Sequence, residues 1–178
     1  EITRPQLLAT RFAKLFEELA TPGIDTDAFN REYLHNLGYG TQPLPHALEL
    51  CQALSALGCR LYILTNGLSG PQRRRLAGSG LTPYLSDIFV SEETGFQKPR
   101  KEFYDYVFAR IPDFAKSRAL MVGDSLSSDM EGARNAGVDA CWYNPKGKTA
   151  PPDLLAPTGP IRYEIRELME LAEILAAA

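Results

Sequence analysis

Two aspartates five residues apart, Asp124 and Asp129, are the residues whose type and spacing point most directly to chemistry. An apolar run over 119–122 precedes them and predicts a buried strand, so Asp124 would lie at the carboxyl end of that strand and Asp129 at the start of a helix. Two carboxylates held close together repel each other unless a positive charge lies between them. A hard divalent cation such as Mg²⁺, which prefers oxygen ligands, would provide that charge. The alternative is structural: Asp129 would only cap the helix, and Asp124 would only end a turn.

A second segment places small polar groups directly after another apolar run. That run ends in Thr65, Asn66 and Gly67, and a helix signal follows in which Ser69 and Gln72 have the spacing of a capping box. A hydroxyl group beside the amino terminus of a helix makes an anion site. Taken alone, the same residues also fit an ordinary connection between a strand and a helix.

A third segment contributes a positive charge. Lys98 lies between a glycine-containing loop and a predicted helix that starts near Arg100, and a strand-like run over 87–91 comes before it. An isolated lysine in such a loop is usually a solvated surface residue. Its place after a strand makes Lys98 a candidate for binding an anion together with the polar groups of the other two segments.

The elements around these segments predict how they meet. Strand-like runs alternate with helical patterns, which predicts an α/β fold: a Rossmann-like parallel sheet with helices on both faces. The expected strands lie near 60–65, 87–91, 118–123, 139–143 and 161–164, and the stretch 144–160 is expected to be a loop. Ligands of such sheets bind at the carboxyl ends of the strands. Thr65, Lys98 and Asp124 would therefore converge on one crevice, where a phosphate ester with Mg²⁺ would use all three.

In these segments the chain resembles the haloacid dehalogenase-like hydrolase superfamily, whose members are mostly phosphatases. The stretch 64–67 resembles its second motif, Lys98-Pro99 its third and 123–129 its fourth, and the resemblance runs from about residue 45 to the end. It implies a set of roles, which we state as expectations. Lys98 and Asp124 would be catalytic, Thr65, Asn66, Gly67 and Lys98 would bind the substrate, and Asp124 and Asp129 would hold Mg²⁺.

The first motif of that superfamily, an apolar strand that ends in Asp-x-Asp-x-Thr and supplies the nucleophile, is not found. The only Asp-x-Asp is formed by Asp25 and Asp27, which follow a helix end and a turn rather than a strand. We expect Asp25 or Thr26 to cap a helix that carries Phe29 and Tyr33 on one face, and we interpret the aspartate pair as structural.

The sequence opens at Glu1 rather than at methionine, and we interpret it as an amino-terminal truncation. Residues 1–42 would form part of a helical cap domain, and residues 43–178 would form the core without its first strand. By the resemblance, that strand lies between those that end at Thr65 and Asp124. Its loss would expose two hydrogen-bonding edges.

The resemblance implies hydrolysis of a phosphomonoester through an aspartyl-phosphate, whose nucleophile is missing from this chain. The metal-free dehalogenase branch is disfavoured, because it typically lacks the Gly123-Asp124 pair. The stretches 91–93 and 141–142 are most similar to the house-cleaning branch of 5′-nucleotidases that act on pyrimidine and related nucleoside monophosphates. A sugar phosphate is the alternative substrate. The alternative class is a catalytically dead fragment or pseudoenzyme that only binds ions or partners.

Composition agrees with a cytoplasmic enzyme. The chain has 178 residues, 44% hydrophobic content and a net charge of −3, which gives no electrostatic footprint for nucleic acid. No run is long enough to span a membrane. Its three cysteines lack the spacing of a metal site. We expect a small phosphorylated substrate as the partner, and the sequence leaves the oligomeric state open.

Overall fold

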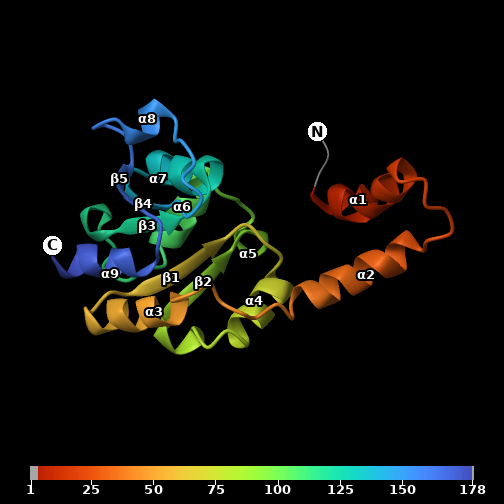
Figure 1. The fold of residues 1–178 in the computed structure, drawn as a ribbon, viewed down its shortest axis with the longest axis horizontal. Coiled ribbons are helices and arrows are strands. Elements are labelled where there is room, and N and C mark those ends of the chain that lie inside the picture. The colour runs from red at the N-terminus through yellow and green to blue at the C-terminus, as the bar shows by residue number, and fades with distance from the viewer. Residues whose placement is uncertain (1–3, 178) are drawn as a thin grey trace.

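The structure, a computed structural model, describes residues 4–177 and has the α/β fold expected from the sequence (Figure 1). Every strand pair in it is parallel. The strands are β1 (Leu61–Thr65), β2 (Leu85–Val90), β3 (Leu120–Gly123), β4 (Asp139–Tyr143) and β5 (Ile161–Ile165). The predicted strands are thus confirmed to within two residues at each end, which is the precision expected where element ends fray.

The strands form two separate sheets rather than one. Within residues 4–177, β1 pairs only with β2, and β3, β4 and β5 form a three-stranded sheet in that order. Among the described residues, β1 and β3 therefore each keep one edge without a neighbouring strand. Val122 on β3 is 39% exposed, which is unusual for the middle of an apolar strand in such a fold. Two unpaired edges in these positions are what loss of a strand between β1 and β3 would leave.

Helices cover both faces of the sheets. They are α3 (Ala47–Ala56), α4 (Ser69–Ala77), α5 (Ser91–Thr94), α6 (Lys101–Phe108), α7 (Glu131–Ala136), α8 (Pro152–Leu155) and α9 (Met169–Ala176). Short helical turns are η1 (Thr82–Tyr84), η2 (Lys116–Arg118) and the π-helical turn η3 (Leu126–Met130). The expectation of an uninterrupted loop over 144–160 was wrong, because α8 forms there and buries Leu154. Proline starts this helix without cost, since the first helical N–H needs no partner.

The side chains of β4 show how one strand serves two cores. Ala140 and Trp142 belong to a cluster with α6 and α7, whereas Cys141 belongs to a cluster with α3 and α9. This alternation is the two-residue period of a strand that is buried on both faces. Burial of Cys141 raises the pKa of its thiol to about 12, with a smaller contribution from Glu170. Packing is therefore its role, as it is for the half-buried Cys51.

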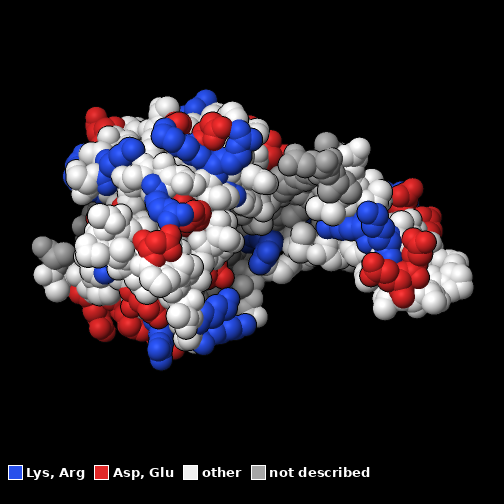
Figure 2. All heavy atoms as spheres, turned by 90° about the horizontal axis from the view of Figure 1, so that it is seen from above, with Lys and Arg blue, Asp and Glu red and all other residues white. Residues whose placement is uncertain are grey.

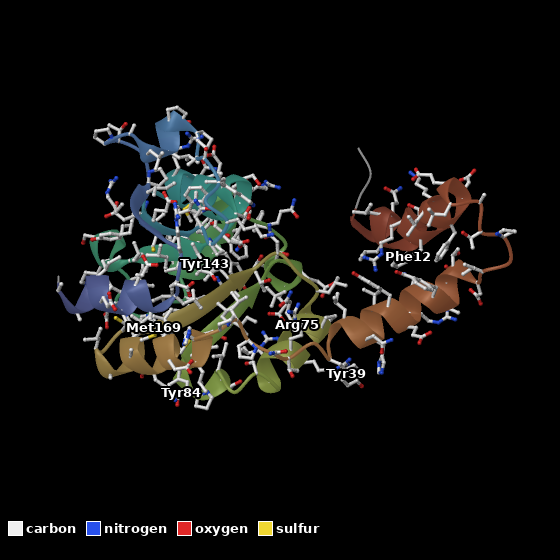
Figure 3. The ribbon with its side chains drawn as sticks, in the orientation of Figure 1. Phe12, Tyr39, Arg75, Tyr84, Tyr143 and Met169 are labelled. Carbon is white, nitrogen blue, oxygen red and sulfur yellow. The ribbon has the colours of Figure 1, made fainter. Side chains whose placement is uncertain are left out.

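The first two helices, α1 (Arg4–Glu18) and α2 (Thr26–Leu37), form an arm that lies apart from the sheets (Figure 1). Phe12 points toward α2 (Figure 3), and its ring meets those of Phe29 and Tyr33 edge to face, at centroid distances of 4.8 and 5.0 Å. Phe29 and Tyr33 nevertheless remain 41% and 40% exposed, and α2 has no buried residue. The arm thus has an apolar face that its own two helices do not cover.

The structure confirms that Asp25 is a helix cap. Its Oδ1 accepts hydrogen bonds from the backbone N–H groups of Asp27 (3.1 Å) and Ala28 (2.9 Å) at the start of α2. These bonds satisfy two of the free N–H groups that every helix start presents. Asp25 and Asp27 lie on the arm rather than at a strand end, which agrees with their interpretation as structural residues.

Candidate active site

Lys98 lies in the loop between α5 and α6, and its ammonium connects the two sheets. The Nζ atom donates hydrogen bonds to the carbonyl of Leu64 on β1 (2.7 Å) and to Oδ1 of Asp129 after β3 (2.6 Å). The side chain is only 11% exposed. Lys98 is therefore not a solvated surface lysine, and the ion pair offsets the cost of burying its charge.

Asp129 lies in the π-helical turn and is buried, at 6% exposure. Its Oδ2 accepts the backbone N–H of Ser125 (3.2 Å), while Oδ1 faces Lys98. The helical cap is Ser125, whose hydroxyl accepts the N–H of Ser128. The interpretation of Asp129 as a mere cap is thus excluded. A side chain at Gly123 would overlap this carboxylate, so the glycine before Asp124 is needed for Asp129 to fit.

Asp124 follows β3 directly, as the sequence predicts, and it is exposed. The indole Nε1 of Trp142 donates to the Asp124 carbonyl (3.2 Å) from the neighbouring strand, which fixes the backbone there. Sequence reasoning missed this contact, although Trp142 stands opposite Gly123 in the strand register. A hollow of about 490 Å³ opens at this strand end, and Asp124, Val122 and Leu44 lie in its wall. The carboxylate of Asp124 is therefore accessible to ligands.

The end of β1 supplies the second group of predicted residues. Thr65 ends the strand half-buried, and Gly67 is buried, with its carbonyl accepting the Ser91 hydroxyl (3.4 Å). Asn66 is exposed, but its carboxamide faces the protein and binds the backbone of Lys98. The structure therefore brings Asn66, Lys98 and Asp129 together, with Thr65 beside the carbonyl that Lys98 binds.

The predicted capping box at the start of α4 was wrong. Ser69 is the first residue of the helix rather than its cap, and it has no capping bond with Gln72. Instead, its N–H donates to Oε2 of Glu92 (2.7 Å) and its hydroxyl donates to Glu93. Carboxylates from α5 thus take the place at the helix start that we expected for an external anion, because negative charge is stabilised there.

Glu93 is the residue on which the charged contacts between α4 and α5 converge. Arg73 on α4 binds both of its carboxylate oxygens, at 2.8 and 2.7 Å. The hydrogen bonds from Arg73 and Ser69 lower the pKa of Glu93 from its ordinary value of 4.5 to about 2. α4 and α5 are joined by this pair, and α5 leads into the loop that carries Lys98. On the face that Figure 2 shows, basic and acidic side chains are interspersed.

The donor set after β3 suits Mg²⁺ in kind. Mg²⁺ keeps several waters and usually takes one or two carboxylates, and Asp124 offers an exposed carboxylate beside the hollow. Asp129 shares its oxygens between Lys98 and a backbone N–H. Within residues 4–177 no group of three or more histidine, cysteine, aspartate or glutamate side chains gathers as a metal cage. The two aspartates therefore fit a partly hydrated Mg²⁺ ion rather than a dehydrated one.

Comparison with known proteins agrees with this geometry. A family model described as haloacid dehalogenase-like hydrolase matches residues 4–137. The chain belongs to this family of hydrolases. The solved structure of the HAD-hydrolase YfnB from Bacillus subtilis, which was bound to magnesium and reveals interdomain movement, superimposes with a TM-score of 0.85 at 43% identity. That alignment covers 97% of this chain and 73% of YfnB.

Curated relatives extend the comparison to named activities. YfnB itself is 44% identical over 177 residues, which are 98% of this chain and 72% of YfnB. The pyrimidine 5′-nucleotidase PynA of Streptococcus pneumoniae is 39% identical over 145 residues, 82% of this chain and 61% of PynA. The pyrimidine 5′-nucleotidase YjjG of Escherichia coli is 34% identical over 174 residues, 98% of this chain and 73% of YjjG. The chain thus spans between 61% and 73% of these relatives. In the described part of the chain, no helix is long and apolar enough to cross a membrane.

Proposed function

We propose that the protein that carries this chain is a Mg²⁺-dependent phosphomonoester hydrolase whose substrates are nucleoside 5′-monophosphates. The observation that carries the proposal is the buried Lys98 ammonium, which lies between the end of β1 and Asp129 after β3. Thr65 follows Leu64 at the end of β1, and the exposed Asp124 follows β3. Together with the Lys98 cation, these groups fit a phosphoryl group and a metal ion. The nucleotidase relatives PynA and YjjG support the choice of substrate class.

We propose further that residues 1–42 are part of a cap and that residues 43–178 are a core without its first strand. Two observations support this: the unpaired edges of β1 and β3, and the uncovered apolar face of the arm. The nucleophile would then lie outside residues 1–178, on the strand that fills the gap. Ser125, which follows Asp124, does not replace it, since its hydroxyl accepts a backbone N–H and contacts another serine, Ser127, rather than a histidine.

In this mechanism Lys98 and Thr65 hold the phosphoryl oxygens and orient phosphorus toward the attacking carboxylate. The carboxylate forms a bond to phosphorus while the ester P–O bond breaks, and the alcohol leaves with a proton from an acid outside this chain. Water then cleaves the aspartyl-phosphate and releases inorganic phosphate. A Mg²⁺ ion held by Asp124 and Asp129 would offset the repulsion between the two anionic reactants.

The test uses the full-length protein with p-nitrophenyl phosphate and a panel of nucleoside monophosphates and sugar phosphates, with and without EDTA. We expect turnover that EDTA abolishes and Mg²⁺ restores, with nucleoside monophosphates preferred. Equal activity with the chelator would refute the metal role, and preference for a sugar phosphate would refute the substrate class. No turnover at all, in a folded protein, would favour a pseudoenzyme.

A pair of matched variants tests the site itself. Asp124→Asn should lower kcat by at least about 100-fold, because it removes a charge at the strand end where metal and phosphate would meet. Asp25→Asn should leave kcat nearly unchanged, because asparagine also caps helices and Asp25 lies on the arm. Similar losses from both changes would reopen Asp25 as a catalytic residue.

A further inference from the structure

Asn66 and Lys98 are 32 residues apart in sequence, yet the carboxamide of one pairs with the backbone of the other. Oδ1 of Asn66 accepts the Lys98 N–H at 2.8 Å, and Nδ2 donates to the Lys98 carbonyl, also at 2.8 Å. Both distances are close to the optimum for hydrogen bonds between amides. One side chain thus satisfies both backbone groups of a single residue, much as a neighbouring strand would.

This pairing fixes Lys98 at both of its ends. The backbone is held by Asn66, and the ammonium is held by the carbonyl of Leu64, two residues earlier on the same chain segment. A lysine side chain has four rotatable bonds, and its order is lost easily when only one end is held. With the backbone anchored to the end of β1, the ammonium has a defined place between β1 and Asp129.

We propose that Asn66 is a positioning residue that fixes the Lys98 ammonium for the phosphoryl group, and that it does not recognise the base or sugar of the substrate. The inference rests on the proposed function for the role of Lys98, and it changes the substrate-binding role that the sequence motif suggested for Asn66. Its carboxamide uses its oxygen and one N–H on Lys98. Its effect on catalysis therefore passes through a group that every phosphomonoester meets in the same way.

The experiment compares Asn66→Ala and Asn66→Ser in the full-length protein on p-nitrophenyl phosphate and on several nucleoside monophosphates. We expect kcat to fall by about 10- to 100-fold, the loss that a small displacement of a catalytic group produces. The fold-loss should be equal for all substrates and should leave their order of preference unchanged. Serine should not rescue activity, because it is polar but too short to reach both backbone groups of Lys98. Losses that differ among substrates would overturn the proposal in favour of substrate recognition.

The matched control is Asn135→Ala. Asn135 on α7 donates one hydrogen bond to the carbonyl of Pro99, the residue next to Lys98, at 2.9 Å. It contacts the same loop from a different element, and its hydrogen bond goes to Pro99 rather than to Lys98. We expect less than about a twofold change in kcat, in line with the small net effect of one exposed hydrogen bond. A loss as large as that of Asn66→Ala would mean that general order of the loop, rather than Asn66, places Lys98.

Two further measurements separate this inference from the proposed function. In a Lys98→Gln background, Asn66→Ala should cause little additional loss of kcat/KM, because both changes act on one group. A full additional loss would contradict the proposal. Hydrogen exchange of the 95–100 loop, which does not depend on activity, should speed up in Asn66→Ala and stay unchanged in Asn135→Ala. Unchanged exchange in Asn66→Ala would overturn the inference. If the loop exchanges as expected in both variants but the unaltered protein shows no turnover, only the proposed function is refuted.

Discussion

The ammonium of Lys98 lies 2.6 Å from Oδ1 of Asp129, and the two side chains are only 11% and 8% exposed. The pair connects the loop after α5 with the turn after β3, and the Leu64 carbonyl adds a contact with β1. It therefore bridges the two sheets, which share no ladder of backbone hydrogen bonds. The same lysine that would bind phosphate also holds together the two halves of the core.

Loss of one member of this pair should be costly, because the other charge would stay buried without a partner. We expect Lys98→Met in residues 1–178 to lower the free energy of unfolding by about 3–5 kcal/mol. The exposed i,i+4 pair of Lys101 and Asp105 provides the control. Lys101→Met should cost less than about 0.5 kcal/mol. Urea unfolding measures both, and equal effects would show that burial adds nothing to the first pair.

A glycine in α7 is required by the tyrosine that packs on it. Cβ of an alanine at Gly132 would overlap the hydroxyl of the fully buried Tyr104 and lie 2.6 Å from its Cζ. We expect Gly132→Ala to destabilise the chain by about 1–3 kcal/mol through overpacking. A Cβ at Gly70 in α4 would meet no atom within 4 Å, so Gly70→Ala should instead stabilise the chain by up to about 1 kcal/mol. Thermal unfolding of the two variants gives the comparison, and similar shifts would contradict the packing argument.

The pair of Arg73 and Glu93 predicts a dependence of stability on pH. The pKa of Glu93 falls from 4.5 to about 2 on folding, so between these values the unfolded chain binds a proton that the folded chain does not. Stability contributed by Glu93 is thus fully present above pH 4.5 and is lost as the pH falls toward 2. Glu93→Gln should remove this contribution, so the gap between it and the unaltered chain should narrow on acidification. Denaturant unfolding from pH 6 to 3 measures the gap, with Glu173→Gln on α9 as control, and a constant gap would contradict the assignment.

The sequence predicted the ends of β1 and β3 well because apolar runs and the small polar residues after them are local signals. Thr65 and Asp124 therefore fell in their observed places at strand ends. What it could not predict were pairings between distant segments, which leave no local pattern. Glu92 and Glu93 come 23 and 24 residues after Ser69, and they replaced the predicted capping box. The hydrogen bonds between Asn66 and the backbone of Lys98, 32 residues later, were missed for the same reason, since the motif around Asn66 says nothing of them.

The gap between β1 and β3 leads to the last prediction: residues 1–178 alone should have no phosphatase activity. Thr65 ends β1, Asp124 follows β3, and Lys98 contacts both segments through Leu64 and Asp129. We propose that the attacking carboxylate belongs to a further strand between β1 and β3. Purified residues 1–178 should therefore show no turnover of p-nitrophenyl phosphate above that of full-length protein with its attacking aspartate changed to asparagine.

The two samples fail for different reasons, which the structure allows us to separate. The full-length variant keeps the strand and should bind inorganic phosphate, because only the nucleophile has changed. If residues 1–178 lack the strand, as we propose, Val122 and the edges of β1 and β3 should stay exposed and exchange their amide hydrogens quickly. Turnover by residues 1–178 at a rate comparable to the full-length enzyme would show that the nucleophile lies within this chain. Slow amide exchange at the edges of β1 and β3 would show that these edges are covered without a further strand.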